Sequence, residues 1–504
     1  MGLMLPNFYS ATVLVVATTA VYLVAKVVYN LYFHPLARFP GPFAYRATRL
    51  AWLLQYNKGT LSKDMLAFHK RYGPIVRIAP DELAFNHPDA WKEIYGHKTE
   101  EFPKFQPFYH PSGHPTNIVT EPSRANHRQL RLQLAPQFSD RSMREQEPII
   151  KKYMDLLVTR LRENAFDPNR IDASTGLQAR RPLDLVAYYT WTTFDAIGDL
   201  AFGEPFGCLD RVKDDPWIKG IFDAMKKSAV IVALSYLGLD TVVLPILKRF
   251  INKGRAAHDE RTAQKLRRRM ELKVERPDLI EGILRKAESM DMDFTTLGSN
   301  ASVLIVAGSE TTSTLLSGVT YLLLRNPDVL RKLTDEVRSS FNSEEEITLL
   351  SVGKLNYMLA CLNEGLRKYP PVTVGMPRFI PQGTSAVIAG EVIPAGTKVA
   401  VWQWATYHSA KYFTDPFGFH PERFLHDPRF ANDKLDMLQP FSFGPRNCVG
   451  RNLAYAEMRL ILAKIIYNFD MQLVDENVDW LEHKSFIVHI KPPLPVYLTP
   501  VKRA

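Results

Sequence analysis

The sequence predicts a mainly α-helical protein with small β-sheets, an α+β fold, preceded by one transmembrane helix. Helical patterns dominate residues 124–341, whereas turn-punctuated β-branched runs are short, and an uncharged apolar segment lies near the first residue. Of the 504 residues, 46% are hydrophobic and 11% aromatic, which is enough for a large core. Because no internal repeat or flexible linker divides the sequence, we expect residues 43–504 to form one domain.

The apolar N-terminal segment predicts a membrane anchor over residues 1–33. No side chain between Gly2 and Ala25 is charged, and residues 8–25 would span roughly 27 Å as a helix, close to the thickness of a bilayer's hydrocarbon core. Basic residues follow before the first acid, Asp64, which favours a cytoplasmic position for the rest of the chain. A cleaved signal peptide is the alternative, but it would need basic residues before the apolar stretch.

Prolines and hydrophobic periodicity predict the next elements. Residues 34–42 hold three prolines and a glycine, which predicts a stiff hinge after the anchor. A second apolar stretch, residues 229–247, is interrupted by Asp240 and Pro245, so shallow membrane contact or a wall of the substrate-access path is expected, with a buried helix as the alternative. Further expected elements are strands at 75–79, 83–85 and within 385–402, and helices at about 294–324 and 452–469.

Charge and motifs exclude several classes of function. The net charge of +10 would permit nucleic-acid binding, but acids flank the basic run at residues 265–270, which is typical of a solvated helix face; a basic surface also suits anionic lipid or an acidic redox partner. The 26 glycines form no GxGxxG motif, and no GxSxG motif is present. His110 and His114 enclose a proline and a glycine, which predicts a loop rather than a zinc-binding helix.

Cys448 has the most informative surroundings of the three cysteines. Cys208 and Cys361 are typical of buried, inert thiols. In the stretch FSFGPRNCVG, Gly444 and Gly450 allow the backbone to turn tightly and to approach a flat group closely. Cys448 also lies just before a predicted helix, whose amide donors and dipole favour a thiolate.

The cysteine loop resembles that of a known family. Phe441, Gly444, Arg446, Cys448 and Gly450 match, position for position, the FxxGxRxCxG haem loop of the cytochrome P-450 superfamily, and the resemblance extends from the hinge to the C-terminus. It implies the cytochrome P-450 fold and haem b (iron protoporphyrin IX), with Cys448 as the axial thiolate ligand of the iron. It also implies that Arg446 contacts a haem propionate and that Phe441 packs beside the sulfur.

Two further motifs resemble propionate contacts of that family. His127 and Arg131 stand four apart in NHRQLR and resemble its WxxxR motif, with histidine in place of the usual tryptophan. Arg378 in GMPRF resembles a further propionate ligand, although a surface arginine is the alternative.

The motifs EGLR and PERF resemble the family's Glu-Arg-Arg cluster. Glu364 and Arg367 lie three apart on one predicted helix face, and on its own such a pair is usually a weak surface ion pair. Because PERF follows, Arg423 resembles the third member of the cluster. The resemblance implies a structural role for these residues and no catalytic one.

The motif AGSETT lies inside the apolar helix predicted at 294–324. Gly308 costs roughly 1 kcal/mol relative to alanine in a helix, and close approach of the backbone to a ligand would explain it. Thr311 can return its hydroxyl to the carbonyl of Ala307, which would open a groove in the helix. The resemblance implies that Glu310 and Thr311 form an acid-alcohol pair that relays protons to dioxygen; a solvent-facing glutamate and a neutral threonine are the alternative.

The resemblance implies a haem-thiolate monooxygenase of the endoplasmic reticulum, with its catalytic domain in the cytoplasm. NADPH-cytochrome P-450 reductase would supply electrons, with cytochrome b5 as a second donor. The hinge and the cysteine region resemble fungal biosynthetic members, which implies an apolar natural product such as a polyketide or terpenoid as substrate. The alternatives are a haem-thiolate isomerase or dehydratase and a non-enzymatic haem sensor. By family position, the expected pocket walls are residues 105–109, 303–307, 371–376 and 485–490.

Overall fold

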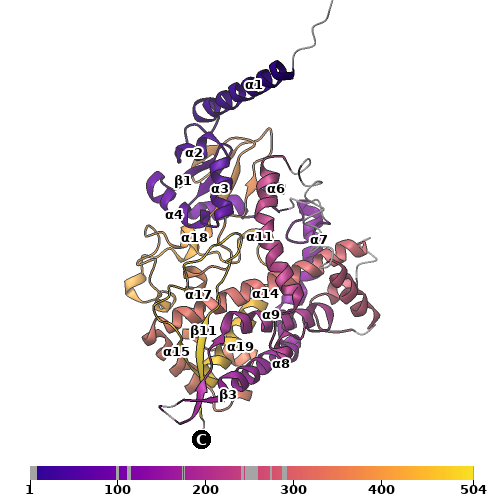
Figure 1. The fold of residues 1–504 in the computed structure, drawn as a ribbon, viewed down its shortest axis with the longest axis vertical. Coiled ribbons are helices and arrows are strands. Elements are labelled where there is room, and N and C mark those ends of the chain that lie inside the picture. The colour runs from indigo at the N-terminus through magenta and orange to yellow at the C-terminus, as the bar shows by residue number, and fades with distance from the viewer. Residues whose placement is uncertain are drawn as a thin grey trace, which may run out of the picture.

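The computed structural model describes residues 8–97, 101–109, 115–172, 174, 176–239, 243, 259–272, 275–285 and 292–502 (Figure 1). The described chain is mainly helical, as predicted. Its N-terminal helices are α1 (Phe8–Val28), α2 (Phe43–Ala47), α3 (Leu50–Lys58), α4 (Leu61–Tyr72), α5 (Pro88–Tyr95), α6 (Gln106–Tyr109), α7 (Arg124–Leu134), α8 (Asp140–Asn164), α9 (Leu185–Phe202), α10 (Cys208–Arg211) and α11 (Pro216–Tyr236). The later helices are α13 (Glu281–Leu284), α14 (Phe294–Leu324), α15 (Pro327–Ser340), α16 (Leu349–Val352), α17 (Asn356–Lys368), α18 (Gln403–Tyr407) and α19 (Arg451–Asn468).

The strands form small sheets, and five of the eleven described strands, β1, β2, β7, β8 and β9, lie where the sequence predicted strands. The largest sheet has the order β1-β2-β9-β6, in which β2 and β9 are parallel and the other pairs antiparallel. A second sheet has the order β10-β11-β5, and β3-β4 and β7-β8 are two-stranded. The bounds are β1 (Ile75–Ala79), β2 (Glu82–Phe85), β3 (Phe166–Ile171), β4 (Gln178–Arg180), β5 (Leu183–Asp184), β6 (Arg378–Phe379), β7 (Ala386–Ile388), β8 (Glu391–Ile393), β9 (Lys398–Val401), β10 (Phe469–Leu473) and β11 (Pro495–Pro500).

Helix α1 projects from the body of the protein in Figure 1. Its apolar side chains are exposed, and the helical stretch Ser10–Phe33 is long and apolar enough to cross a membrane. A π-helical turn, η1 (Tyr29–Phe33), ends the helix, and His34 is extended because Pro35 follows it. The helix therefore stops where the proline-rich segment begins.

The middle of the chain, residues 124–341, is rich in helices as predicted, although strands β3, β4 and β5 interrupt the helices after Asn164, where Pro168 cannot continue a helix. The run at 265–270 is helical, but it is not uniformly solvated: the Arg269 side chain is 3% exposed and pairs with Asp278 at 2.9 Å and with Glu281 at 2.7 Å. Neighbouring Arg268 is exposed, as predicted.

Two other expectations concern residues only partly described. His110 and His114 lie outside the described residues. Of the apolar stretch 229–247, the part up to Tyr236 belongs to α11, where Ala229 is buried and Val230 is 50% exposed. Asp240 and Pro245 lie outside the described residues.

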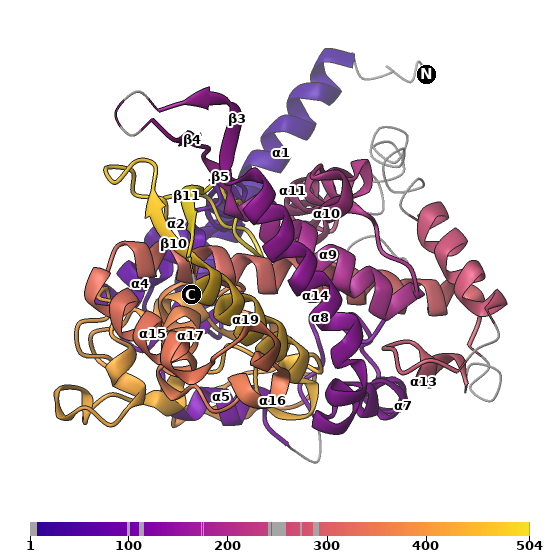
Figure 2. The same cartoon turned by 90° about the horizontal axis from the view of Figure 1, so that it is seen from below.

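Helix α14 crosses the middle of the protein in both views, with α9 and α19 beside it (Figures 1 and 2). Asp293 caps its N-terminus by accepting a hydrogen bond from the Thr296 amide at 2.8 Å, and the helix has its predicted bounds. Gly308 permits contact with α9, since a Cβ atom there would lie 2.9 Å from Cδ1 of Ile197. Gly308 also lies in the wall of the cavity described below, so the close approach to a ligand that the sequence suggested stays a prediction.

Candidate active site

A cavity of about 300 Å³ lies between α7, α14, α19 and the cysteine loop. It brings together Thr311 and every residue that the sequence assigned to the cofactor. Those cofactor residues are His127, Arg131, Arg378, Phe441, Arg446, Cys448 and Gly450. Glu310 is not among the residues that line it.

The cysteine loop is fixed by a backbone that only glycine permits. Gly444 has φ +76°, and a Cβ atom there would lie 1.9 Å from the Tyr95 carbonyl oxygen. The Cys448 amide donates a hydrogen bond to the Phe441 carbonyl at 2.8 Å. These contacts place Cys448 in the wall of the cavity, to which its side chain is exposed.

Burial sets the ionisation of the Cys448 thiol in the protein chain. It raises the pKa of the thiol above its usual value, and the Gly450 amide and the charges of Arg131 and Arg451 oppose this effect without cancelling it. The sequence predicted that the following helix would favour a thiolate. The opposing contributions are present, but desolvation is larger.

Cationic side chains line one side of the cavity. Arg131 donates to the Asn447 carbonyl at 2.7 Å, whereas Nη1 of Arg378 is buried without a hydrogen-bond partner in the described structure. The backbones of Lys104 and Arg378 are bridged, so the two side chains come from adjacent positions. Burial first, and then the charges of Arg378 and Arg446, lower the pKa of Lys104 to about 6. An anionic group in the cavity would oppose this shift.

Arg446 and His127 complete this side of the cavity. Arg446 pairs with Glu101 at 2.9 Å and donates to the carbonyls of Glu121 and Pro122, so the protein itself satisfies most of its donors. Burial and the surrounding cations, Arg446 first, lower the pKa of His127 to about 3, so its imidazole is neutral. His127 can therefore donate or accept one hydrogen bond but adds no charge.

Of the two adjacent residues Glu310 and Thr311 on helix α14, only Thr311 lines the cavity. The Thr311 hydroxyl donates to the Ala307 carbonyl at 2.7 Å, the hydrogen bond expected from the sequence. Glu310 is buried and accepts from Lys491 at 2.5 Å and from the Thr314 hydroxyl at 3.2 Å. Burial raises its pKa, and Lys491 opposes the shift. The alternative of a solvent-facing Glu310 is therefore wrong.

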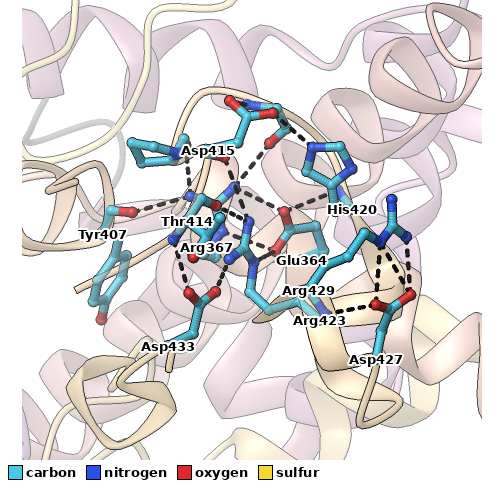
Figure 3. A network of polar contacts seen from close by, with 12 residues as sticks. Glu364, Arg367, Tyr407, Thr414, Asp415, His420, Arg423, Asp427, Arg429 and Asp433 are labelled. Carbon is cyan, nitrogen blue, oxygen red and sulfur yellow. Dashed lines mark hydrogen bonds and ion pairs between the residues drawn. The ribbon is translucent and has the colours of Figure 1, made fainter. Parts of the chain in front are cut away.

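The Glu-Arg-Arg residues meet in a fully buried cluster (Figure 3). Arg367 binds both carboxylate oxygens of Glu364, at 2.7 and 2.8 Å, and Arg423 approaches the same carboxylate at 3.3 Å. A surface ion pair, the alternative for EGLR, is excluded because both side chains have no exposed area. Asp433, which the sequence did not indicate, pairs with Arg423.

Three of the four expected pocket walls line the cavity. They contribute Tyr109, Val303, Leu304, Ala307, Pro371, Val372 and Met376. Residues 485–490 do not line it: the Ser485 amide bonds the Gly59 carbonyl, and the ring of His489 stacks on Tyr369 at 4.1 Å. This segment packs against neighbouring elements instead.

Three charged residues of this region were not predicted from the sequence. Lys104 and Glu457 line the cavity, and Lys491 binds Glu310. Glu457 stands in the same stretch as the cysteine loop, nine residues after Cys448, which was the one available signal. Lys491 is 181 residues from Glu310, and no local pattern links them.

Fold and site together define a helical protein whose single accessible cysteine faces a cation-lined cavity. The chain belongs to the cytochrome P450 family, whose model matches residues 40–499. A cytochrome P450 monooxygenase of Talaromyces stipitatus is 48% identical over 496 residues, 97% of this chain and 95% of the relative. Averantin hydroxylase of Dothistroma septosporum is 45% identical over 481 residues (94% and 88%), and trichothecene C-15 hydroxylase of Fusarium sporotrichioides is 44% identical over 493 residues (96% and 97%).

Proposed function

We propose that this chain is a haem-thiolate monooxygenase that inserts one oxygen atom of dioxygen into an apolar small molecule of fungal secondary metabolism. The observation that carries the proposal is the Cys448 thiol facing a cavity with cations on one side and Thr311 on another. The relatives named as monooxygenases and hydroxylases support the reaction class.

The residues of the cavity fit a haem group. Cys448 would supply the thiolate ligand, Arg131 and Arg378 would pair with the propionates, and Lys104 would add a hydrogen-bond donor. Nη1 of Arg378, which has no hydrogen-bond partner in the described structure, could donate to one of these propionates. Haem, when bound, supplies dioxygen activation, which thiolate ligation favours. The protein's own share is to hold the group, exclude water and position protons.

Proton delivery is assigned to α14. Thr311 keeps its hydroxyl at the cavity wall by bonding the Ala307 carbonyl, so it can pass a proton to a molecule in the cavity. Glu310 is the neighbouring acid, and its carboxylate accepts hydrogen bonds from Lys491 and Thr314. We expect Glu310 to exchange protons with the cavity when its side chain leaves Lys491.

The substrate is proposed from the walls of the cavity. Val303, Leu304, Ile118, Val372 and Met376 present aliphatic surface, which suits an apolar molecule. Averantin and trichothecene, the compounds in the names of two relatives, mark the range of natural products to be screened.

The proposal also covers the electron donor and the location of the protein in the cell. The sequence has no GxGxxG nucleotide-binding motif, so an external donor is expected: NADPH-cytochrome P-450 reductase, with cytochrome b5 as a second candidate. Helix α1 suits a single-pass anchor in the endoplasmic reticulum with the catalytic domain in the cytoplasm.

The test is the absorption spectrum of membranes containing the protein, reduced with dithionite and exposed to carbon monoxide. We expect a strongly red-shifted Soret band that Cys448→Ser abolishes while haem remains bound. Absence of the band from folded, haem-supplied wild type would overturn the proposal. Adding reductase and NADPH then separates the classes: a monooxygenase consumes NADPH, whereas an isomerase, a dehydratase or a sensor does not need it.

A further inference from the structure

Glu457 is a buried carboxylic acid in the wall of the cavity. It lies on α19, one turn beyond Leu453, and only 1% of its surface is exposed. Its neighbours in the wall include Thr312 and Met458. The expected proton relay on α14 does not use it, and it is not a member of the Glu-Arg-Arg cluster.

Both carboxyl oxygens of Glu457 are buried without a hydrogen-bond partner in the described structure. An ionised carboxylate in that position would cost several kcal/mol, since no cation or donor compensates it. Burial accordingly raises the pKa of Glu457 to about 8, and the Thr312 hydroxyl, close by but outside hydrogen-bond geometry, is the one described group that lowers it. No charged side chain of the described chain contributes. Glu457 is therefore protonated at neutral pH.

Glu310, on α14, and Glu457, on the neighbouring helix α19, are thus buried acids with different surroundings. Glu310 has a lysine partner and does not line the cavity, whereas Glu457 has none and does. Thr311 and Thr312, adjacent on α14, both line the cavity, and Thr312 is the one near Glu457. A neutral carboxyl has a proton to give, while a carboxylate paired with a lysine must first acquire one.

Resting on the function proposed above, we propose that Glu457 is a second acid of the site, which donates a proton into the cavity through the hydroxyl of Thr312. In this relay the Glu457 O–H bond breaks as the Thr312 oxygen takes the proton, and the original Thr312 proton passes to a water molecule in the cavity. The hydroxyl is unchanged after the step, and the carboxylate left behind recovers its proton from solvent.

The first test is the protonation state, read by infrared difference spectroscopy of the haem-loaded, full-length protein across pH values on either side of about 8. We expect the C=O stretch of a protonated carboxyl on the acidic side, lost on the alkaline side and absent from Glu457→Gln. Glu476→Gln, the same change at an exposed position, should leave the band unaltered. If the variant loses no such band, the proposal is wrong.

The second test follows protons during turnover with reductase and NADPH, using dioxygen itself as the probe. Reduction of dioxygen to water consumes more protons than its reduction to hydrogen peroxide. Loss of an acid that supplies protons should therefore increase the share of dioxygen that leaves as peroxide. We expect the peroxide formed per NADPH to rise severalfold in Glu457→Gln, with a larger solvent deuterium isotope effect, and to stay unchanged in Glu476→Gln. An unchanged peroxide share would overturn the proposal.

A third variant distinguishes loss of the proton relay from a folding defect. Thr312→Val keeps the carboxyl and removes the relay, so it should retain the infrared band and still raise the peroxide share. Retention of the carbon monoxide band in each variant shows an intact thiolate-ligated haem. If wild type lacks that band, the proposed function fails, and the infrared test still reports on Glu457 by itself.

Discussion

Three buried glutamates of this protein meet three different surroundings. Glu364 lies between Arg367 and Arg423, Glu310 pairs with Lys491, and Glu457 has no charged partner among the described residues. The same side chain can therefore serve as a structural ion-pair partner, as an acid paired with a base or as a neutral acid, because its neighbours set the cost of its charge.

The raised pKa of Glu457 predicts a pH-dependent stability. Folding raises this pKa from 4.5 to about 8. At pH values between these two, the folded protein therefore keeps a proton on Glu457 that the unfolded chain has released. The stability contribution is present below the unfolded pKa and is lost as pH rises through the folded one, at about 1.4 kcal/mol per pH unit. Because glutamine does not titrate, Glu457→Gln should gain stability relative to wild type across this interval and level off above it. Urea unfolding of the detergent-solubilised protein at several pH values measures the difference, and a difference independent of pH would contradict the prediction.

Lys491 should stabilise the fold through Glu310. Its Nζ contacts the Glu310 carboxylate at 2.5 Å and the Thr314 hydroxyl at 2.6 Å, and both members of the ion pair are nearly fully buried. We expect Lys491→Met to cost about 3–5 kcal/mol of unfolding free energy, because it leaves a buried charge unpaired or forces its protonation. Lys491→Arg should recover part of the loss, and exposed Lys354→Met serves as the control in urea unfolding. Equal stability of Lys491→Met and wild type would show that the pair contributes nothing.

At the scale of elements, three glycines of α14 should respond differently to the same substitution. An added Cβ would meet open space at Gly298, Cδ1 of Ile197 at 2.9 Å at Gly308, and the Tyr369 ring at 2.1 Å at Gly318. Gly298→Ala should therefore stabilise the helix by up to about 1 kcal/mol. Gly308→Ala should be near neutral, since the end of the Ile197 side chain can move. Gly318→Ala should cost about 1–3 kcal/mol or more, because a buried ring cannot yield. Thermal unfolding of the three variants tests this order, and a similar effect at all three positions would refute it.

Sequence patterns predicted elements better than contacts between elements. The bounds of α14 follow from an apolar run with a capping aspartate, and β1 follows from β-branched residues between turns. The β3-β4 hairpin was missed because most of its side chains are exposed and show no apolar alternation. The family motifs predicted seven cofactor residues that line one cavity, whereas Lys491, the partner of Glu310, comes from a segment 181 residues away that no periodicity connects to α14.

At the scale of the whole protein, the Glu-Arg-Arg cluster of Figure 3 is connected to the cysteine loop by hydrogen bonds through Tyr407. Arg367 donates to the carbonyls of Tyr407 and Pro416 at 3.0 and 2.7 Å. The Tyr407 hydroxyl in turn accepts from the Gln439 amide at 2.9 Å, two residues before Phe441. The loop that presents Cys448 is thereby held from a helix more than fifty residues earlier in the sequence.

This connection predicts that the cluster is needed for a formed cofactor site. Arg367→Leu removes both hydrogen bonds that Glu364 receives from within α17 and leaves its buried carboxylate with Arg423 and the His420 backbone amide, which should cost about 3–5 kcal/mol. We expect most of the variant to lack the red-shifted carbon monoxide band and to be cleaved by trypsin faster than wild type. Arg429→Leu is the matched control: it removes a nearby arginine whose side chain is 61% exposed and whose pair with Asp427 lies at the surface. If Arg367→Leu kept the band and the protease resistance of this control, the cysteine loop would be held by its own glycine turn and the Phe441 hydrogen bond, without help from the cluster.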